Sequence, residues 1–196
     1  MEEEINLDEI ENLVDKSIKG EVTVLNKWFD DASFTQKCIF ILNSQDIRFK
    51  TAFFAINVLL RHVDRFFCFW EPSVRYEFSQ FILGLANSKE NLLNENHPLL
   101  TYYSKLAGTV IAEGWNSDER FQAFLVDIAQ SQPKSIINNK ISLSILEELS
   151  ESMRILRVSS FAGIPLASII NFSLQSIKFS ENNQEIINAS LNSILS

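Results

Sequence analysis

Histidine is the first residue type to test for acid–base chemistry, and the chain has two, His62 and His97. His62 lies two residues before Asp64. On a helix, residues two apart point to different sides, so this spacing does not predict a charge-relay pair. His97 stands directly before Pro98, at the start of a predicted helix. We therefore predict no catalytic histidine.

The two cysteines, Cys38 and Cys68, are the next candidates for metal or redox chemistry. Neither belongs to a Cys-x-x-Cys pair, and the two histidines do not form a His-x-x-x-His pair, so the usual ligand spacing of a zinc site is missing. Cys38 begins the apolar run of residues 38–42. We expect both cysteines to be small buried hydrophobic residues of a reducing compartment. We expect no metal ion and no cofactor.

The short motifs of phosphate-binding and hydrolytic enzymes are also missing. The sequence has no glycine-rich phosphate loop, no Gly-x-Ser-x-Gly elbow and no His-Glu-x-x-His. Three pairs of adjacent acidic residues are expected to begin helices or to lie on exposed faces: Asp30-Asp31, Asp118-Glu119 and Glu147-Glu148. Three tryptophans near predicted helix ends are expected to pack in the core: Trp28, Trp70 and Trp115. The sequence therefore predicts that the chain is not an enzyme, and it indicates no binding residue.

The formal net charge of −8 is concentrated at the N-terminus. Residues 1–31 hold ten acids against three lysines, a local net charge of −7: Glu2, Glu3, Glu4, Asp8, Glu9, Glu11, Asp15, Glu21, Asp30 and Asp31 against Lys16, Lys19 and Lys27. An acidic surface repels phosphate backbones, so we expect no nucleic-acid partner. Two interpretations remain open for this region, a solvated helix or a surface that attracts a basic protein.

The N-terminus and the apolar runs give no sign of a signal peptide or of a membrane-spanning segment. The chain starts with Met1 and three glutamates, whereas a signal peptide starts with basic and then apolar residues. No apolar stretch approaches the roughly 20 residues that a membrane span needs. We expect a soluble intracellular protein, in the cytoplasm or the nucleus, without membrane insertion.

The elements that position these residues are predicted to be helices. One apolar stripe follows a 3.6-residue period at 0, +3, +4, +7, +11, +14 and +18: Phe49, Ala52, Phe53, Ile56, Leu60, Val63 and Phe67. Most other segments carry shorter versions of it. Five glycines and four prolines are too few for the turns of a many-stranded sandwich or barrel. The fold class is therefore all-α.

Caps and breakers divide the chain into about ten helices. Helices are expected near residues 7–18, 21–28, 33–42, 46–67, 72–87, 98–114, 117–128, 141–156, 166–178 and 185–195. Asn6 and Gly20 are expected to bound the first helix, Ser33 to cap the third in a capping box with Gln36, and Asn116 or Ser117 to cap the helix that carries Phe121. The polar stretch 88–97 is expected to be the longest loop before the second half. Pro165 forbids a regular helix through residue 164.

Gly108 interrupts a predicted helix, where glycine costs about 1 kcal/mol relative to alanine. We expect it to mark a close approach of a second helix. Paired helices with a rough repeat near 40 residues are typical of HEAT-type arrays. The fold expected for residues 1–196 is a single HEAT-like α-solenoid of about five antiparallel helix pairs, with an irregular bundle as the alternative.

Three stretches of the sequence resemble one protein family. Residues 42–60, Leu-Asn-Ser-Gln-Asp-Ile-Arg-Phe-Lys-Thr-Ala-Phe-Phe-Ala-Ile-Asn-Val-Leu-Leu, are similar to the second repeat of importin-β superfamily transport receptors. Residues 105–115, ending in Gly114-Trp115, resemble a helix of the exportin seven and exportin four type. Residues 157–161, Arg-Val-Ser-Ser-Phe, followed by Leu166, Ile169 and Ile170, resemble a later helix of the same proteins. The segment 163–165, Gly-Ile-Pro, departs from that pattern.

The resemblance implies the N-terminal arch of a nuclear transport receptor, present here as a fragment or a truncated form. Such a receptor binds the small GTPase Ran in its GTP state, export cargo and nucleoporin Phe-Gly repeats. Inner helices, about residues 21–28, 46–67 and 98–113, would carry the contacts with Ran. The alternative from a different class is a HEAT-type scaffold for protein–protein interaction that is unrelated to nuclear transport.

Overall fold

The computed structural model describes residues 7–18, 23–115, 118–130, 136–155, 166–179, 183, 184, 186–188 and 190. The chain divides into two compact units, Met1–Cys68 and Phe69–Ser196, and each is described by itself. Every regular element among the described residues is helical, so the all-α prediction is confirmed. The single solenoid and the number of helix pairs stay predictions.

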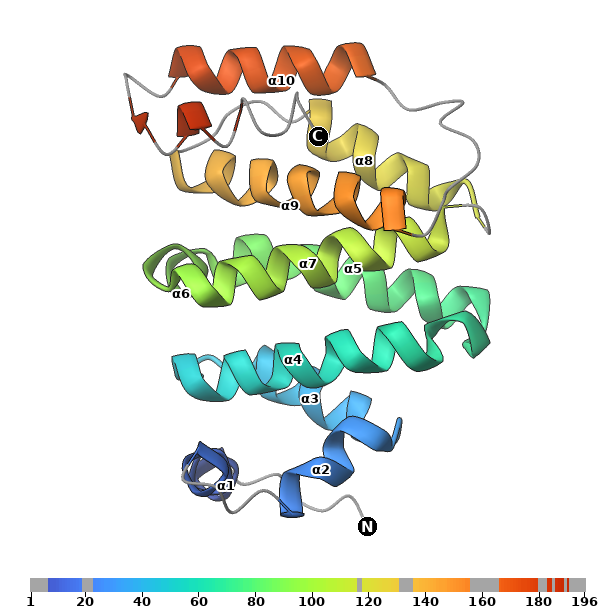
Figure 1. Cartoon of the computed structure of the whole chain (residues 1–196), viewed down its shortest axis with the longest axis vertical. Coiled ribbons are helices and arrows are strands. Elements are labelled where there is room, and N and C mark those ends of the chain that lie inside the picture. The colour runs from blue at the N-terminus through green and yellow to red at the C-terminus, as the bar shows by residue number, and fades with distance from the viewer. Residues whose placement is uncertain are drawn as a thin grey trace. The chain divides into compact units, whose positions relative to one another are not determined.

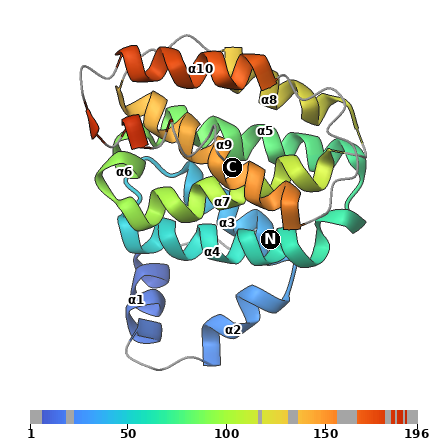
Figure 2. The same cartoon turned by 45° about the horizontal axis from the view of Figure 1, so that its top comes forward.

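The first unit is built on one long helix. Its elements are α1 (Leu7–Ile18), α2 (Thr23–Asp30), α3 (Phe34–Asn43) and α4 (Phe49–Phe66), and α4 runs into the 3₁₀ turn η1 (Phe67–Phe69). α4 contacts α1, α2 and α3, and α1 lies across α4 at a steep angle (Figures 1 and 2). The predicted apolar stripe is buried at five of its seven positions and half-buried at Phe49 and Phe53. The period in the sequence therefore identified one side of the buried surface of α4, which also includes Ala55 and Leu59.

The second unit is arranged around α7. Its helices are α5 (Pro72–Ser88), α6 (Glu90–Glu95), α7 (His97–Gly114), α8 (Arg120–Gln130), α9 (Ile136–Ile155) and α10 (Leu166–Phe179). α7 contacts α5, α6, α8 and α9, and α10 packs on α8 and α9. α7 and α9 lie side by side in both views (Figures 1 and 2). A helix with neighbours on several sides must be apolar nearly all round, and α7 is: twelve of its eighteen residues are buried.

Tyr103 ties α7 to α5. Its hydroxyl is buried and donates a hydrogen bond to the carbonyl oxygen of Ile82 at 3.1 Å. Burial raises the pKa of this phenol well above its usual value, so Tyr103 stays neutral and keeps its proton for the bond.

Gly108 lies where α7 crosses α9. A Cβ atom on Gly108 would stand 2.7 Å from the backbone nitrogen of Leu149 and 2.9 Å from the backbone carbon of Glu148. Only glycine lets the two backbones approach this closely. The predicted close approach is therefore confirmed, and α9 is the helix that makes it.

Gly114 ends α7 as predicted, and it also leaves room for a ring. A Cβ atom there would stand 2.1 to 2.4 Å from three ring carbons of Phe121 at the start of α8. The glycine therefore lets the first turn of α8 fold back against the end of α7.

Two predictions, one about a loop and one about a helix cap, are wrong. The stretch 88–97 was expected to be a loop, but it contains α6, because Leu93 is almost completely buried and Glu90 favours the first turn of a helix. The capping box at Ser33 does not form. Ser33 has helical backbone angles, φ −62° and ψ −23°, and its side chain makes no cap; its backbone N–H donates to Asp31 Oδ1 at 2.9 Å.

Several boundaries differ from those expected from the sequence. α4 begins at Phe49 rather than at residue 46, and α9 begins at Ile136 rather than at residue 141. α10 begins at Leu166 as expected and ends one residue late. The features expected at Asn6, Gly20, Asn116, Ser117 and Pro165 lie outside the described residues, as does most of 185–195.

Candidate interaction surface

α4 presents one largely polar stripe on its exposed side, which shares Phe53 with the edge of the predicted apolar stripe. The stripe follows the helical period and consists of Lys50, Phe53, Asn57, Arg61 and Asp64. Its charged members are exposed, whereas Phe53 and Asn57 are half-buried. The Asn57 amide donates to the Phe53 carbonyl oxygen at 2.8 Å, which fixes the side chain along the helix. This stripe is the part of α4 that a partner could contact.

Acidic residues of α1 hold the first turn of α4. Arg48 Nη1 lies 2.7 Å from Glu11 Oε2, and Lys50 Nζ lies 2.7 Å from Asp15 Oδ1. Both pairs reach the solvent, so each contributes little to stability by itself.

Asp30 of α2 holds the last turns of α4. Its Oδ1 lies 2.5 Å from Arg65 Nη1 and 3.6 Å from Arg61 Nη2. Together with the pairs of α1, this contact shows that part of the acidic N-terminus binds basic residues of its own unit. These acids are therefore not available as a bare anionic surface for a basic partner.

The two cations around Asp30 give a testable effect on stability. We expect Asp30→Asn to lower the free energy of unfolding by about 0.5–1 kcal/mol at low salt, because two partly exposed pairs are lost. In about 1 M salt the loss should nearly vanish, because screening weakens exposed pairs. Urea denaturation at both salt concentrations measures this. The matched control is Asp127→Asn on α8, an exposed acid whose replacement changes the net charge equally. If the loss of unfolding free energy in Asp30→Asn were the same at both salt concentrations, the ion pairs of Asp30 would not be its cause.

The exposed residues of α7 lie in its N-terminal half. Pro98, Thr101, Tyr102 and Lys105 are exposed at helical spacing, whereas the C-terminal half of α7 is buried. Glu148 of α9 interacts electrostatically with Lys105. Burial raises the pKa of Glu148, and the ammonium group of Lys105 acts in the opposite direction. This face is a second surface on which a partner could bind.

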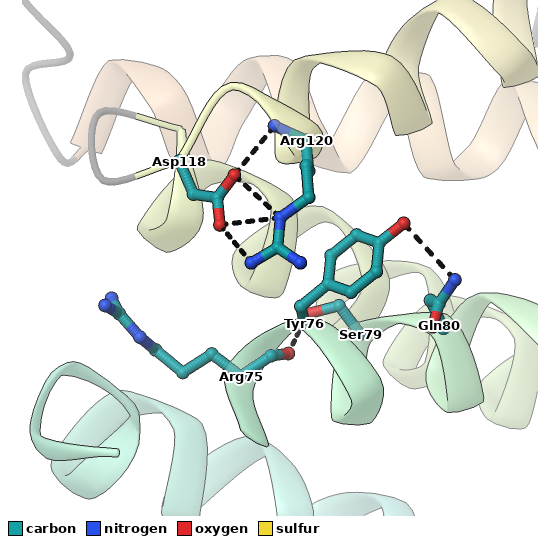
Figure 3. Close-up of polar contacts among 6 residues, drawn as sticks. All are labelled: Arg75, Tyr76, Ser79, Gln80, Asp118 and Arg120. Atoms are coloured by element: carbon teal, nitrogen blue, oxygen red, sulfur yellow. Dashed lines mark hydrogen bonds and ion pairs between the residues drawn. The ribbon is translucent and has the colours of Figure 1, made fainter. Parts of the chain in front are cut away.

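A polar and aromatic cluster joins α5 to the start of α8 (Figure 3). Asp118 accepts hydrogen bonds from Arg120 Nε at 2.9 Å and from Arg120 Nη2 at 2.5 Å, and its Oδ1 also accepts from the backbone N–H of Arg120. The guanidinium lies over the Tyr76 ring, 4.2 Å from its centroid. The bonds from Arg120 hold the pKa of Asp118 below its usual range.

Tyr76 also packs on two aromatic rings of α8. Its ring stacks on Phe124 with centroids 5.3 Å apart and meets Phe121 edge-on. Tyr76 thus contacts a cation and two aromatic rings of α8, and these contacts fasten α8 to α5. The acidic pair at Asp118 was expected to begin a helix or to lie on an exposed face, and Asp118 does lie at the start of α8. The sequence did not predict the contact of Arg120 with Tyr76, because no local spacing joins residues 76 and 120.

His62 is fully buried and takes part in no charge relay with Asp64. Its Nε2 lies 2.6 Å from the Trp28 carbonyl oxygen, and its Nδ1 lies 2.9 Å from Thr35 Oγ1. Burial lowers the pKa of the imidazole, although the hydrogen bond to Trp28 acts in the opposite direction. His97 is exposed at the start of α7.

The two cysteines differ in exposure. Cys38 is buried, and burial raises the pKa of its thiol to about 12, so it remains protonated. Cys68 is exposed, and the prediction that it is buried is wrong. The physical reason is that α4 ends at Phe66 and the chain tightens into a 3₁₀ turn, which buries Phe67 and turns Cys68 outward.

The tryptophans pack as the sequence predicted at two of three positions. Trp28 and Trp115 are buried, and Trp28 meets Phe34 and Phe54 with ring centroids 4.5 and 5.5 Å away. Trp70 is half-buried against Phe78.

Across the described ranges, no group of three or more His, Cys, Asp and Glu side chains gathers where a metal ion could bind. Among the helices described, none is both long enough and apolar enough to cross a bilayer. Comparisons with protein-family models, with curated proteins and with solved structures each find no match for this chain.

Proposed function

We propose that this chain is a segment of an exportin-like nuclear transport receptor, which binds the GTP form of Ran and contributes to the export of cargo proteins. The single observation that supports it most is the crossing of α7 and α9 at Gly108. In a stacked helical array, successive inner helices must pack against one another, and the glycine allows this here. Gly108 also belongs to the stretch 105–115 that resembles the exportins.

The order of the helices supports the same proposal. α7 and α9 are separated along the chain by α8, and α8 and α10 are separated by α9. In space, α7 packs on α9 and α10 packs on α8. Alternate helices therefore contact one another, as they do in a two-layered solenoid of helix pairs. A HEAT-like solenoid is the arrangement we propose for these helices. Of the third resembling stretch, residues 157–161 lie outside the described residues.

The exposed faces of α4 and α7 are the proposed contact surfaces, one in each unit. Their helices correspond to two of the three segments that the resemblance gives as inner helices. A receptor of this kind would shuttle between nucleus and cytoplasm, and it would also bind the Phe-Gly repeats of nucleoporins. The proposal requires no catalytic group.

Pull-down of the chain with Ran tests the proposal. We expect GTP-locked Ran to be retained and GDP-loaded Ran to be lost on washing. Equal retention of both forms, or retention of neither, would contradict Ran binding. Retention of neither form, together with no binding to a Phe-Gly repeat peptide, would favour the alternative of a scaffold unrelated to transport.

A charge-reversal variant tests whether α7 contacts Ran. We expect Lys105→Glu to weaken binding of GTP-locked Ran by about tenfold, because a reversed charge in a contact costs on the order of 1.4 kcal/mol. Lys178→Glu on α10 makes the same change of charge at another exposed position and should leave binding unchanged. Equal affinities of the two variants would exclude the exposed face of α7 as the contact surface.

A further inference from the structure

His62 is the point at which three elements of the first unit meet. The residue lies on α4, Trp28 lies in the last turn of α2, and Thr35 lies in the first turn of α3. The imidazole is fully buried, and both of its nitrogens lie within hydrogen-bond distance of a partner, at 2.6 Å and 2.9 Å. One titratable side chain therefore fastens two helices to a third.

The partners fix the tautomer of the neutral ring. The Trp28 carbonyl oxygen can only accept a hydrogen bond, so Nε2 carries the proton and donates. Nδ1 of the neutral ring is then an acceptor, and the Thr35 hydroxyl donates to it. The neutral imidazole satisfies every polar group in the site.

Protonation disturbs this arrangement in two ways. A proton on Nδ1 turns that nitrogen into a donor, so the Thr35 hydroxyl has to accept and loses the acceptor for its own proton. The ring also becomes a cation that is shielded from water, because His62 is fully buried.

The charged groups around the site do not reverse this cost. Asp30 of α2 and Asp31 of the following turn favour the cation, and Arg65 of α4 opposes it; the group that α3 presents to the ring is Thr35. Both carboxylates are exposed, and Asp30 is already paired with Arg61 and Arg65. Burial is the largest influence on the pKa of His62, and the net direction is downward.

We propose that His62 is an acid-sensitive latch, which fastens α2 and α3 to α4 while its ring is neutral and loosens this packing when the ring is protonated. The proton on Nδ1 ends the bond that Thr35 of α3 donates, whereas Nε2 keeps its proton for the Trp28 carbonyl oxygen of α2. Opening of the packing returns the cation to water. The latch acts without any partner and is independent of Ran binding.

The direction of the pH effect follows from linkage. The pKa of His62 is lower in the folded chain than the ordinary value of 6.5, so between these two values the open chain binds more protons than the closed chain. The latch is therefore fully effective above about pH 6.5 and weakens as the pH falls below it. The opening equilibrium rises by up to about tenfold for each pH unit in this window.

Hydrogen exchange of the α2 and α3 amides between pH 7.5 and pH 5.5 tests the latch, with each rate corrected for the intrinsic effect of pH. We expect opening of these two helices to increase by up to about tenfold on acidification. His62→Gln should abolish this increase, because an amide can donate to Trp28 and accept from Thr35 but does not titrate. His97→Gln, which removes the exposed histidine, should retain it.

Corrected exchange rates of both α2 and α3 that are independent of pH in the unmodified chain would overturn the latch. A response that survives His62→Gln would overturn it equally. If His62→Gln does not fold, NMR titration of the His62 ring in the unmodified chain decides. A pKa below 6.5 is expected, and a value at or above 6.5 would contradict the latch.

Discussion

Replacing Gly108 by alanine is expected to lower the free energy of unfolding by about 1–3 kcal/mol. The added Cβ atom would stand 2.7 Å from the backbone nitrogen of Leu149, and a backbone cannot rotate away as a side chain can. α7 and α9 would have to separate along their contact. This loss outweighs the gain of about 1 kcal/mol that alanine offers over glycine within a helix. Urea denaturation followed by circular dichroism measures the change.

Gly84 of α5 is the matched control. It is exposed within a helix, and nothing lies within 4 Å of the position that its Cβ atom would take. We expect Gly84→Ala to raise the free energy of unfolding by about 0.5–1 kcal/mol, because only the helix propensity changes. If Gly108→Ala were stabilising to the same extent as Gly84→Ala, the close crossing of α7 and α9 would be refuted.

Trp115→Ala is expected to have the largest effect of any single truncation, a loss of about 3–5 kcal/mol. Trp115 follows the last residue of α7 and is 2% exposed, so alanine would leave a cavity that its neighbours fill only in part. Thermal and urea denaturation should both show an earlier transition. The half-buried Trp70 provides the comparison, and Trp70→Ala should cost clearly less. Equal losses would mean that Trp115 is not a central packing residue.

The sequence was sufficient where a property repeats along one helix. One side of the buried surface of α4 follows from a period of 3.6 residues, and the close approach at Gly108 follows from the cost of glycine inside a helix. Neither inference needs to know which helix is the neighbour. That neighbour, α9, could not be named from local spacing.

The sequence was insufficient where the decisive contact is distant along the chain. Thr35 and Trp28 lie 27 and 34 residues from His62 along the chain, so no local sequence pattern predicts these hydrogen bonds. The acids of α1 and α2 similarly find their cations on α4, about 35 residues later. The exposure of Cys68 depended on where α4 ends, and the ends of helices are less regular than their faces.

Titration of the intact chain with Ran, followed by calorimetry, tests the central claim most directly. We predict saturable binding of GTP-locked Ran, with an affinity at least about tenfold higher than that of GDP-loaded Ran, a difference of about 1.4 kcal/mol. Equal affinities for the two nucleotide states, or no heat of binding with either, would contradict the proposal that the chain is a segment of an exportin-like receptor.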